Sequence, residues 1–426
     1  MKSTLSFFII CLLFSSCTFQ KNTITNDVIV KQKQDIYNSN STENFNDQNS
    51  IDFDLIKASF KIFKELALNN SGKSFSFSPA SLNLAMAMVY AGAAGSTAEE
   101  FQKTFHFDKE LSKFLPGIYD YYSSLLRISE DTSMEFKIVN KIFIEKTYPL
   151  NESYTSNIEK FFYGNFEKVD FFNDYRQQEK YINKYVTDFT KQRIKNLLPE
   201  GILNEMTKLV LINALYLKSN WKYSFDEGFT REKLFYADSD KSLKNEFMSQ
   251  RRQGVKYYAD QKFQVLEMEY KTDKYSMLIF LPRDSKTSNI TDNFFTAEYY
   301  LNVCKSIHYD NVYYEIPKFK TESSFSFRSL LEKMGMTESF SDNADFSEIS
   351  QNRDVKISEI LQKVFFEIDE KGSEAAAATA VVMVQVSSAM PSNIEYQFFI
   401  ANRPFIYILK ENTFSTPLFM GVYCGE

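Results

Sequence analysis

Histidine is nearly missing from this chain of 426 residues, with His106 and His308 as its two examples. Nucleophilic catalysis usually needs a base with a pKa near neutrality, and histidine is the usual source. The G-x-S-x-G, H-E-x-x-H, G-x-G-x-x-G and P-loop patterns are absent as well. We interpret His106 as a surface or capping residue at the end of a helical stretch, and His308 as part of a polar segment. The scarcity argues against an enzyme, although a carboxylate-based one stays open.

Cysteine is also scarce, and the four present do not form a framework. Cys11 falls in an N-terminal apolar run, and Cys17 lies three residues after its end. The remaining pair, Cys304 and Cys424, is too widely separated to indicate a disulfide pattern, so we expect unpaired core thiols. No spacing typical of a metal site occurs, and no cofactor is implied.

Positive charge is not in excess, because the chain has 49 Lys and Arg residues and 55 Asp and Glu residues, which give a net charge of −6. Nucleic-acid binding is therefore not indicated. The short basic clusters at 191–195 and 251–252 lie among acids and are interpreted as solvated faces.

The N-terminus carries a targeting signal. Lys2 precedes an apolar run at 5–14, which is too short to span a bilayer and fits a secretory signal. The run ends in Leu-Phe-Ser-Ser-Cys, which resembles a bacterial lipoprotein box. Residues 1–16 would then be a signal peptide and Cys17 the lipidated residue, with the protein secreted across the inner membrane and lipid-anchored at the cell envelope or surface. An ordinary signal peptide with an incidental Cys17 is the alternative.

Residues 17–50 predict a flexible polar tether, since a segment rich in Asn, Asp, Ser and Thr cannot bury enough surface to order itself. Residues 51–426 have no long Pro/Gly/Ser linker. The chain is 44% hydrophobic and 16% aromatic, which is enough for one large globular domain.

Residues 367–380 are unusually small in an otherwise aromatic chain. One interpretation is an Ala-rich helix running into a buried strand. The other is a loop that inserts into a sheet, with Gly372 as a pivot that adopts backbone conformations forbidden to other residues. As a strand, one face would carry the uncharged Ser373, Ala375, Ala377 and Thr379, while Glu374, Ala376 and Ala378 would take the opposite face.

A family resemblance favours the insertable loop. The segment from Glu370 to Thr379 resembles the hinge of the reactive-centre loop in inhibitory serpins. Four further segments resemble serpin motifs in family order, and they lie at 75–81, 209–221, 399–409 and 416–421. These ordered matches extend the resemblance over roughly residues 51–426.

The resemblance implies an α+β fold, with helices packed on three β-sheets, a large central sheet and an exposed reactive-centre loop at about 370–395. It also implies a suicide-substrate inhibitor that forms a covalent acyl complex with a serine protease, and we expect a monomer. The alternatives are a non-inhibitory serpin, which is cleaved without trapping, or a surface interaction lipoprotein.

Two sets of site residues follow from the resemblance. The reactive bond is placed between Val386 and Ser387, with 385–386 and 389–390 as competing bonds. Valine at that position suits an elastase-like protease with a shallow apolar pocket. The sheet-opening region would comprise Ser78, Ser81, Asn213, Trp221 and Gln362. Gln362 stands where the family has a histidine, and its amide can still donate and accept hydrogen bonds.

Overall fold

The computed structural model describes residues 51–128, 134–238, 241–284, 294–352, 355–373 and 394–425. These ranges belong to one unit, 48–426. The helices are α2 (Ile51–Asn69), α3 (Pro79–Tyr90), α4 (Gly95–Phe105), α5 (Leu111–Ile128), α6 (Glu152–Phe161), α7 (Phe171–Phe189), α8 (Ala297–Ser306) and α9 (Arg328–Lys333), with the short turns η1 (Glu227–Phe229) and η3 (Glu338–Phe340). None of the helices in this part of the chain is both long and apolar enough to cross a membrane.

A six-stranded sheet runs in the order β10-β11-β12-β4-β2-β3. Its strands are β2 (Met134–Glu145), β3 (Phe166–Val169), β4 (Leu209–Asn220), β10 (Phe319–Ser326), β11 (Ile360–Ile368) and β12 (Gly372–Ser373). Strand β4 is buried along almost its whole length. Its continuous apolar sequence is typical of a central strand that is covered on both faces.

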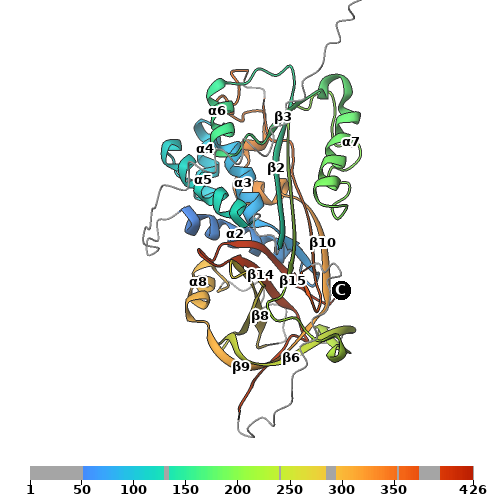
Figure 1. The fold of residues 1–426 in the computed structure, drawn as a ribbon. Helices are drawn as coiled ribbons and strands as arrows, with labels where there is room; N and C mark the ends of the chain where they lie inside the picture. Colours follow the sequence, from blue (N-terminus) through green and yellow to red (C-terminus); the bar gives the residue numbers. More distant parts are fainter. Residues whose placement is uncertain are drawn as a thin grey trace, which may run out of the picture. The chain divides into compact units, whose positions relative to one another are not determined.

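Both faces of this sheet carry a hydrophobic core. On one face, α7 packs over residues such as Phe143, Ile212 and Phe365. On the other face, α3 and its neighbouring helices pack over residues such as Leu211 and Val364. Figure 1 shows α7 on one side of β2 and β3, with α3 to α6 on the other. An inserted strand would therefore need small or apolar side chains on both faces.

The second sheet network holds nine strands, with the path β1-β15-β14-β8-β7-β6-β9-β13 and β5 paired to β6. Its strands are β1 (Phe75–Phe77), β5 (Arg231–Asp238), β6 (Lys241–Ala259), β7 (Phe263–Glu269), β8 (Tyr275–Pro282), β9 (His308–Pro317), β13 (Gln397–Ile400), β14 (Phe405–Glu411) and β15 (Pro417–Tyr423).

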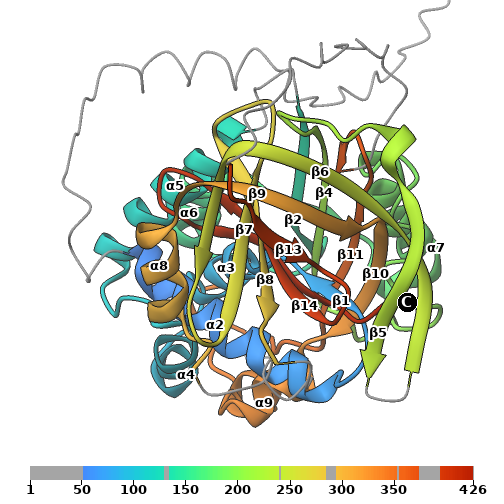
Figure 2. The ribbon, with the colours of Figure 1, turned by 90° about the horizontal axis from the view of Figure 1, so that it is seen from below.

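The number of sheets differs from the expected three, because two of them are continuous through β6 in the described residues. Strand β6 pairs with β5 over its first part, with β9 between 247 and 257, and with β7 at 256–259. The strand bends at a register shift between Arg252 and Val255, where Gly254 has a φ of 66°. Glycine adopts this left-handed conformation without penalty. Figure 2 shows β6 lying alongside both β9 and β7.

Candidate functional site

The hinge begins as a two-residue strand that is already inside the six-stranded sheet. Strand β12 pairs antiparallel with β11 on one side and with β4 on the other. Further along, β4 and β11 pair directly and in parallel, at 211–215 and 360–364. The two strands are therefore joined at one end and parted at the other, with β12 seated in the gap.

Gly372 is needed here for space rather than for backbone freedom. A Cβ atom on Gly372 would lie 1.9 Å from the carbonyl oxygen of Ser219 and 2.7 Å from the Cα of Asn220. Its φ lies outside the left-handed region here, so the role of Gly372 as a pivot during loop movement stays a prediction. The turn before it is closed by the Asp369 carboxylate, which accepts from the backbone N–H of Lys371 at 2.8 Å and of Gly372 at 3.1 Å.

Ser373 is 1% exposed and is held by an aromatic side chain. Its Oγ lies 2.5 Å from the phenol oxygen of Tyr270. Tyr270 in turn stacks on Trp221, with ring centroids 4.4 Å apart and planes at 24°. Burial raises the pKa of Tyr270, so its hydroxyl keeps its proton. The uncharged face predicted for the hinge therefore starts against the core.

Glu370, the first residue of the predicted hinge, makes an ion pair at the same end of the sheet. Its carboxylate lies 3.0 Å from Lys318 Nζ and accepts a 2.6 Å hydrogen bond from Thr230 Oγ1. Burial acts to raise the pKa of Glu370, but the hydrogen bond from Thr230 and the pairing with Lys318 outweigh it and keep that pKa below its usual value. The turn is thus tied to the residue that joins β9 to β10 and to the segment before β5.

A buried polar network lies where β4 and β11 are still paired. The Gln362 amide accepts from Ser78 N at 2.8 Å and donates to Ser78 O at 2.9 Å and to Asn213 Oδ1 at 2.6 Å. Ser78 also caps α3, since its Oγ accepts from Ser81 N. Ser81 Oγ and Asn213 Nδ2 both donate to Asn140 Oδ1, at 2.9 and 2.8 Å. Four of the five predicted sheet-opening residues therefore form one network, completed by Asn140.

Trp221 does not belong to that network. It lies eight residues beyond Asn213, roughly 26 Å along an extended chain. There its indole Nε1 donates to Asp369 O at 2.9 Å, and its backbone N–H donates to Lys371 O at 2.8 Å. Trp221 thus holds the turn that leads into the hinge.

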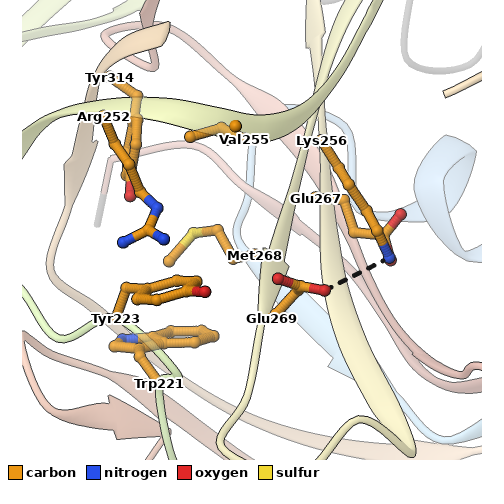
Figure 3. Close-up of a pocket in the computed structure, with 10 residues that line it drawn as sticks. Trp221, Tyr223, Arg252, Val255, Lys256, Glu267, Met268, Glu269 and Tyr314 are labelled. Atoms are coloured by element: carbon orange, nitrogen blue, oxygen red, sulfur yellow. Dashed lines mark hydrogen bonds and ion pairs between the residues drawn. The ribbon is translucent and has the colours of Figure 1, made fainter. Parts of the chain in front are cut away.

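A small hollow, open to solvent, lies beside Trp221 (Figure 3). The guanidinium of Arg252 lies 3.0 Å from the centroid of the Tyr223 ring. Across the hollow, Lys256 pairs with Glu267 at 3.2 Å and with Glu269 at 3.5 Å. The lining is completed by Gly254, Val255, Met268 and Tyr314.

The histidines and cysteines take structural positions. His106 ends α4 with a φ of 59° and lies 2.8 Å from Lys61 Nζ, as expected of a capping residue. Burial and Lys61 lower the pKa of His106, and His308 is exposed at the start of β9. Cys304 and Cys424 are not joined in a disulfide, and burial raises the pKa of Cys304 to about 11. Within the described ranges, no cluster of His, Cys, Asp or Glu is suited to a metal ion.

The sequence matches the family described as Serpin (serine protease inhibitor) over residues 55–425. This chain is a serpin. Human Serpin B4 is 32% identical over 388 residues, which cover 86% of this chain and 96% of that protein. Leukocyte elastase inhibitor A of Mus musculus is 33% identical over 375 residues, with the same two coverages. An uncharacterized serpin-like protein of Thermococcus kodakarensis is 33% identical over 362 residues, covering 85% of this chain and 82% of that protein.

Solved structures confirm the serpin fold. Uncleaved ovalbumin matches with a TM-score of 0.79 at 24% identity, over 89% of this chain and all of that one. Serpin48 of Tenebrio molitor matches with a TM-score of 0.75 at 27% identity, over 90% and 99%. The family is one of protease inhibitors rather than of catalytic proteins, which agrees with the inference from the scarce histidine.

Sequence reasoning missed several residues that complete the serpin hinge and network. These are Tyr270, Asn140, Lys318 and Thr230. Asn140 had a visible signal, since it interrupts an apolar run in β2. Tyr270 had none, because it is one of 26 tyrosines in the chain.

Other predicted residues fall outside the described part of this serpin. They are Cys17, Glu374, Ala375, Ala376, Ala377, Ala378, Thr379, Val386 and Ser387.

Proposed function

We propose that this serpin is a suicide-substrate inhibitor of extracellular serine proteases, and that it traps the protease by inserting its cleaved loop between β4 and β11. The observation that carries the proposal is the place of β12. Gly372 and Ser373 already occupy the gap between these two strands. A strand that continued from Ser373 would extend an existing pairing rather than start a new one.

The chemistry belongs to the target protease. Its catalytic serine oxygen bonds to the carbonyl carbon of Val386, and the peptide bond to Ser387 breaks. The amine of Ser387 leaves with the proton that the protease supplies. The serpin is then held to the protease as an ester, which water would otherwise hydrolyse to free both proteins. Trapping therefore requires insertion to finish before that hydrolysis.

The length of the loop and the hydrogen bonds that it can form in the sheet both favour insertion. A strand of about 14 residues, from 373 to 386, would span roughly 46 Å. About ten new ladder hydrogen bonds at roughly 1 kcal/mol each, together with apolar burial, would drive it. The direct β4–β11 pairing at 211–215 and 360–364 must first separate, and with it the contact between Gln362 and Asn213.

For the target we propose an elastase-like protease. Val386 offers a small apolar side chain, which a shallow pocket accepts and a trypsin-like pocket does not, because its carboxylate would stay unpaired. The similarity to leukocyte elastase inhibitor A supports the same class of target.

The test is to mix the purified protein with an elastase and to look for a complex that survives denaturing electrophoresis. Sequencing of the released peptide should give a start at Ser387. Ser373→Arg should still be cleaved but should form no complex, because it would bury an unpaired charge beside Tyr270. Ser373→Thr is the matched control, since it keeps the hydroxyl and should keep trapping. Cleavage of the wild type without any complex would refute the proposal and favour a non-inhibitory serpin.

We also propose, from the sequence alone, that Cys17 is acylated and anchors the protein at the cell envelope or surface. The multiple acyl chains of a bacterial lipoprotein bind a membrane firmly, whereas one chain binds marginally. The wild type should take up a fatty-acid analogue and partition into detergent, and Cys17→Ala should do neither. Recovery of unlabelled wild-type protein in the soluble fraction would refute the proposed lipid anchor but would not affect the inhibitor proposal.

A further inference from the structure

Tyr270 links the two sheet networks at the hinge. It directly follows β7 and is fully buried. Its hydroxyl reaches Ser373 Oγ at 2.5 Å, and its ring lies 5.1 Å from that of Tyr275. The Tyr275 hydroxyl lies 3.0 Å from Ser219 Oγ, and Ser219 is the β4 residue that pairs with Ser373. The first loop residue in the sheet is therefore held through both its backbone and its side chain.

The ring of Tyr270 is held in place by the indole of Trp221. Trp221 stacks on it at 4.4 Å and pairs with it in an isolated β-bridge. Figure 3 shows the Tyr223 ring lying between the Trp221 indole and the Arg252 guanidinium. Arg252 Nε is buried and has no hydrogen-bond partner in the described residues. Its guanidinium instead lies 3.0 Å from the Tyr223 centroid, as a cation over an aromatic face.

We propose that Tyr270 is a positioning residue for loop insertion, and that the stacked indole of Trp221 fixes its ring. This inference rests on the proposed function. Its hydroxyl keeps Ser373 in the gap between β4 and β11 before a protease arrives. After cleavage, insertion of the loop then starts from a residue that is already paired in the sheet. Insertion therefore competes better with hydrolysis of the ester.

The hydroxyl can be removed without disturbing the stacking of the ring on Trp221. Tyr270→Phe keeps the ring and leaves the buried Ser373 hydroxyl without its partner. Loss of one such hydrogen bond should change the balance between insertion and hydrolysis about fivefold (about 1 kcal/mol). The stoichiometry of inhibition, the moles of serpin consumed per mole of protease trapped, should rise accordingly. The rate at which the protease cleaves the loop should not fall.

Hydrogen exchange gives a second readout that needs no protease. A peptide covering 369–373 should exchange about fivefold faster in Tyr270→Phe, because β12 leaves the sheet more often. Ser373→Ala removes the same hydrogen bond, so the double variant should behave like either single variant.

Tyr154→Phe is the matched control. Its buried hydroxyl donates to Met88 O at 3.2 Å, far from the hinge in the fold. It should lose similar thermal stability while leaving the stoichiometry and the hinge exchange unchanged.

Wild-type exchange at 369–373 and wild-type stoichiometry in Tyr270→Phe would overturn the proposal, and so would equal effects of Tyr154→Phe. If the wild type traps no protease, the proposed function fails by itself. The exchange of Tyr270→Phe then still decides whether Tyr270 holds Ser373 in the sheet.

Discussion

Replacement of Gln362 by leucine should strongly destabilise the uncleaved protein. The change removes an acceptor for Ser78 N and donors for Ser78 O and Asn213 Oδ1. All of these groups are fully buried, so none gains water in exchange. At about 1–3 kcal/mol for each unsatisfied group, the free energy of unfolding should fall by about 4 kcal/mol. Urea denaturation of the purified variant measures this directly.

The same variant also tests the role of the network in sheet opening. Gln362 and Asn213 face each other across the β11–β4 pair that must part during insertion. The leucine variant should therefore convert more readily, on mild heating, to a form with its uncut loop inserted. Gln177→Leu on the exposed surface of α7 serves as the control and should change stability by less than about 0.5 kcal/mol. A loss below about 1 kcal/mol for Gln362→Leu would refute the reasoning, since it would mean that water satisfies the network.

Gln362→His should add a pH dependence that the wild-type network lacks. A neutral imidazole can accept from Ser78 N and donate once, but the charged form has no acceptor left. Burial and the facing N–H would lower the folded pKa of this histidine below its unfolded value of about 6.5. The free energy of unfolding of the histidine variant would be highest above pH 6.5 and would fall as the pH drops through that value, because the unfolded state binds the proton first. Equal stability of the histidine variant at pH 8 and pH 5.5 would contradict this argument.

Three further changes give distinct outcomes. Gly372→Ala should push β12 out of the sheet, since its Cβ would lie 1.9 Å from Ser219 O; faster hydrogen exchange at 369–373 would show it. Glu370→Gln should remove about 1–2 kcal/mol of stability at pH 7 by breaking the pair with Lys318. Because the pKa of Glu370 is lowered, the wild type should lose this advantage as the pH falls below its ordinary value of 4.5. Asp52→Asn should stabilise the protein at pH 7 by up to roughly 3 kcal/mol. Burial, Glu411 and Asp120 raise the pKa of Asp52 from 3.8 to about 6, so the free energy of unfolding of the wild type falls as the pH rises between those values. Parallel pH–stability curves of the wild type and the variant would argue against this.

The hinge and the network could be predicted because short segments carry them. The small residues from Gly372 onward mark a strand that must fit between two others, and the structure seats the first two there. Ser78 and Gln362 were brought together by family resemblance alone. The pairing of β11 with β4 explains their meeting, since it places Gln362 opposite Asn213 and beneath the start of α3.

The site residues that the sequence analysis did not identify depend on the register between distant strands, and the sequence does not display this register. Asn140 joins the network because β2 pairs antiparallel with β4 and sets it opposite Asn213. Tyr270 reaches Ser373 because β7 ends beside the gap in the other sheet. The two-network arrangement likewise follows from the bend of β6 at Gly254, which no local pattern predicted.

The position of Trp221 gives this protein a built-in optical probe. It is the only tryptophan in the 426 residues, and its indole contacts both the hinge turn and Tyr270. In the isolated protein, excitation of indole therefore reports on one place alone, without a label; in a mixture, the emission of the protease alone is subtracted. Movement of the hinge during the encounter with a protease should be readable as a change in emission within the mixing time of a stopped-flow instrument.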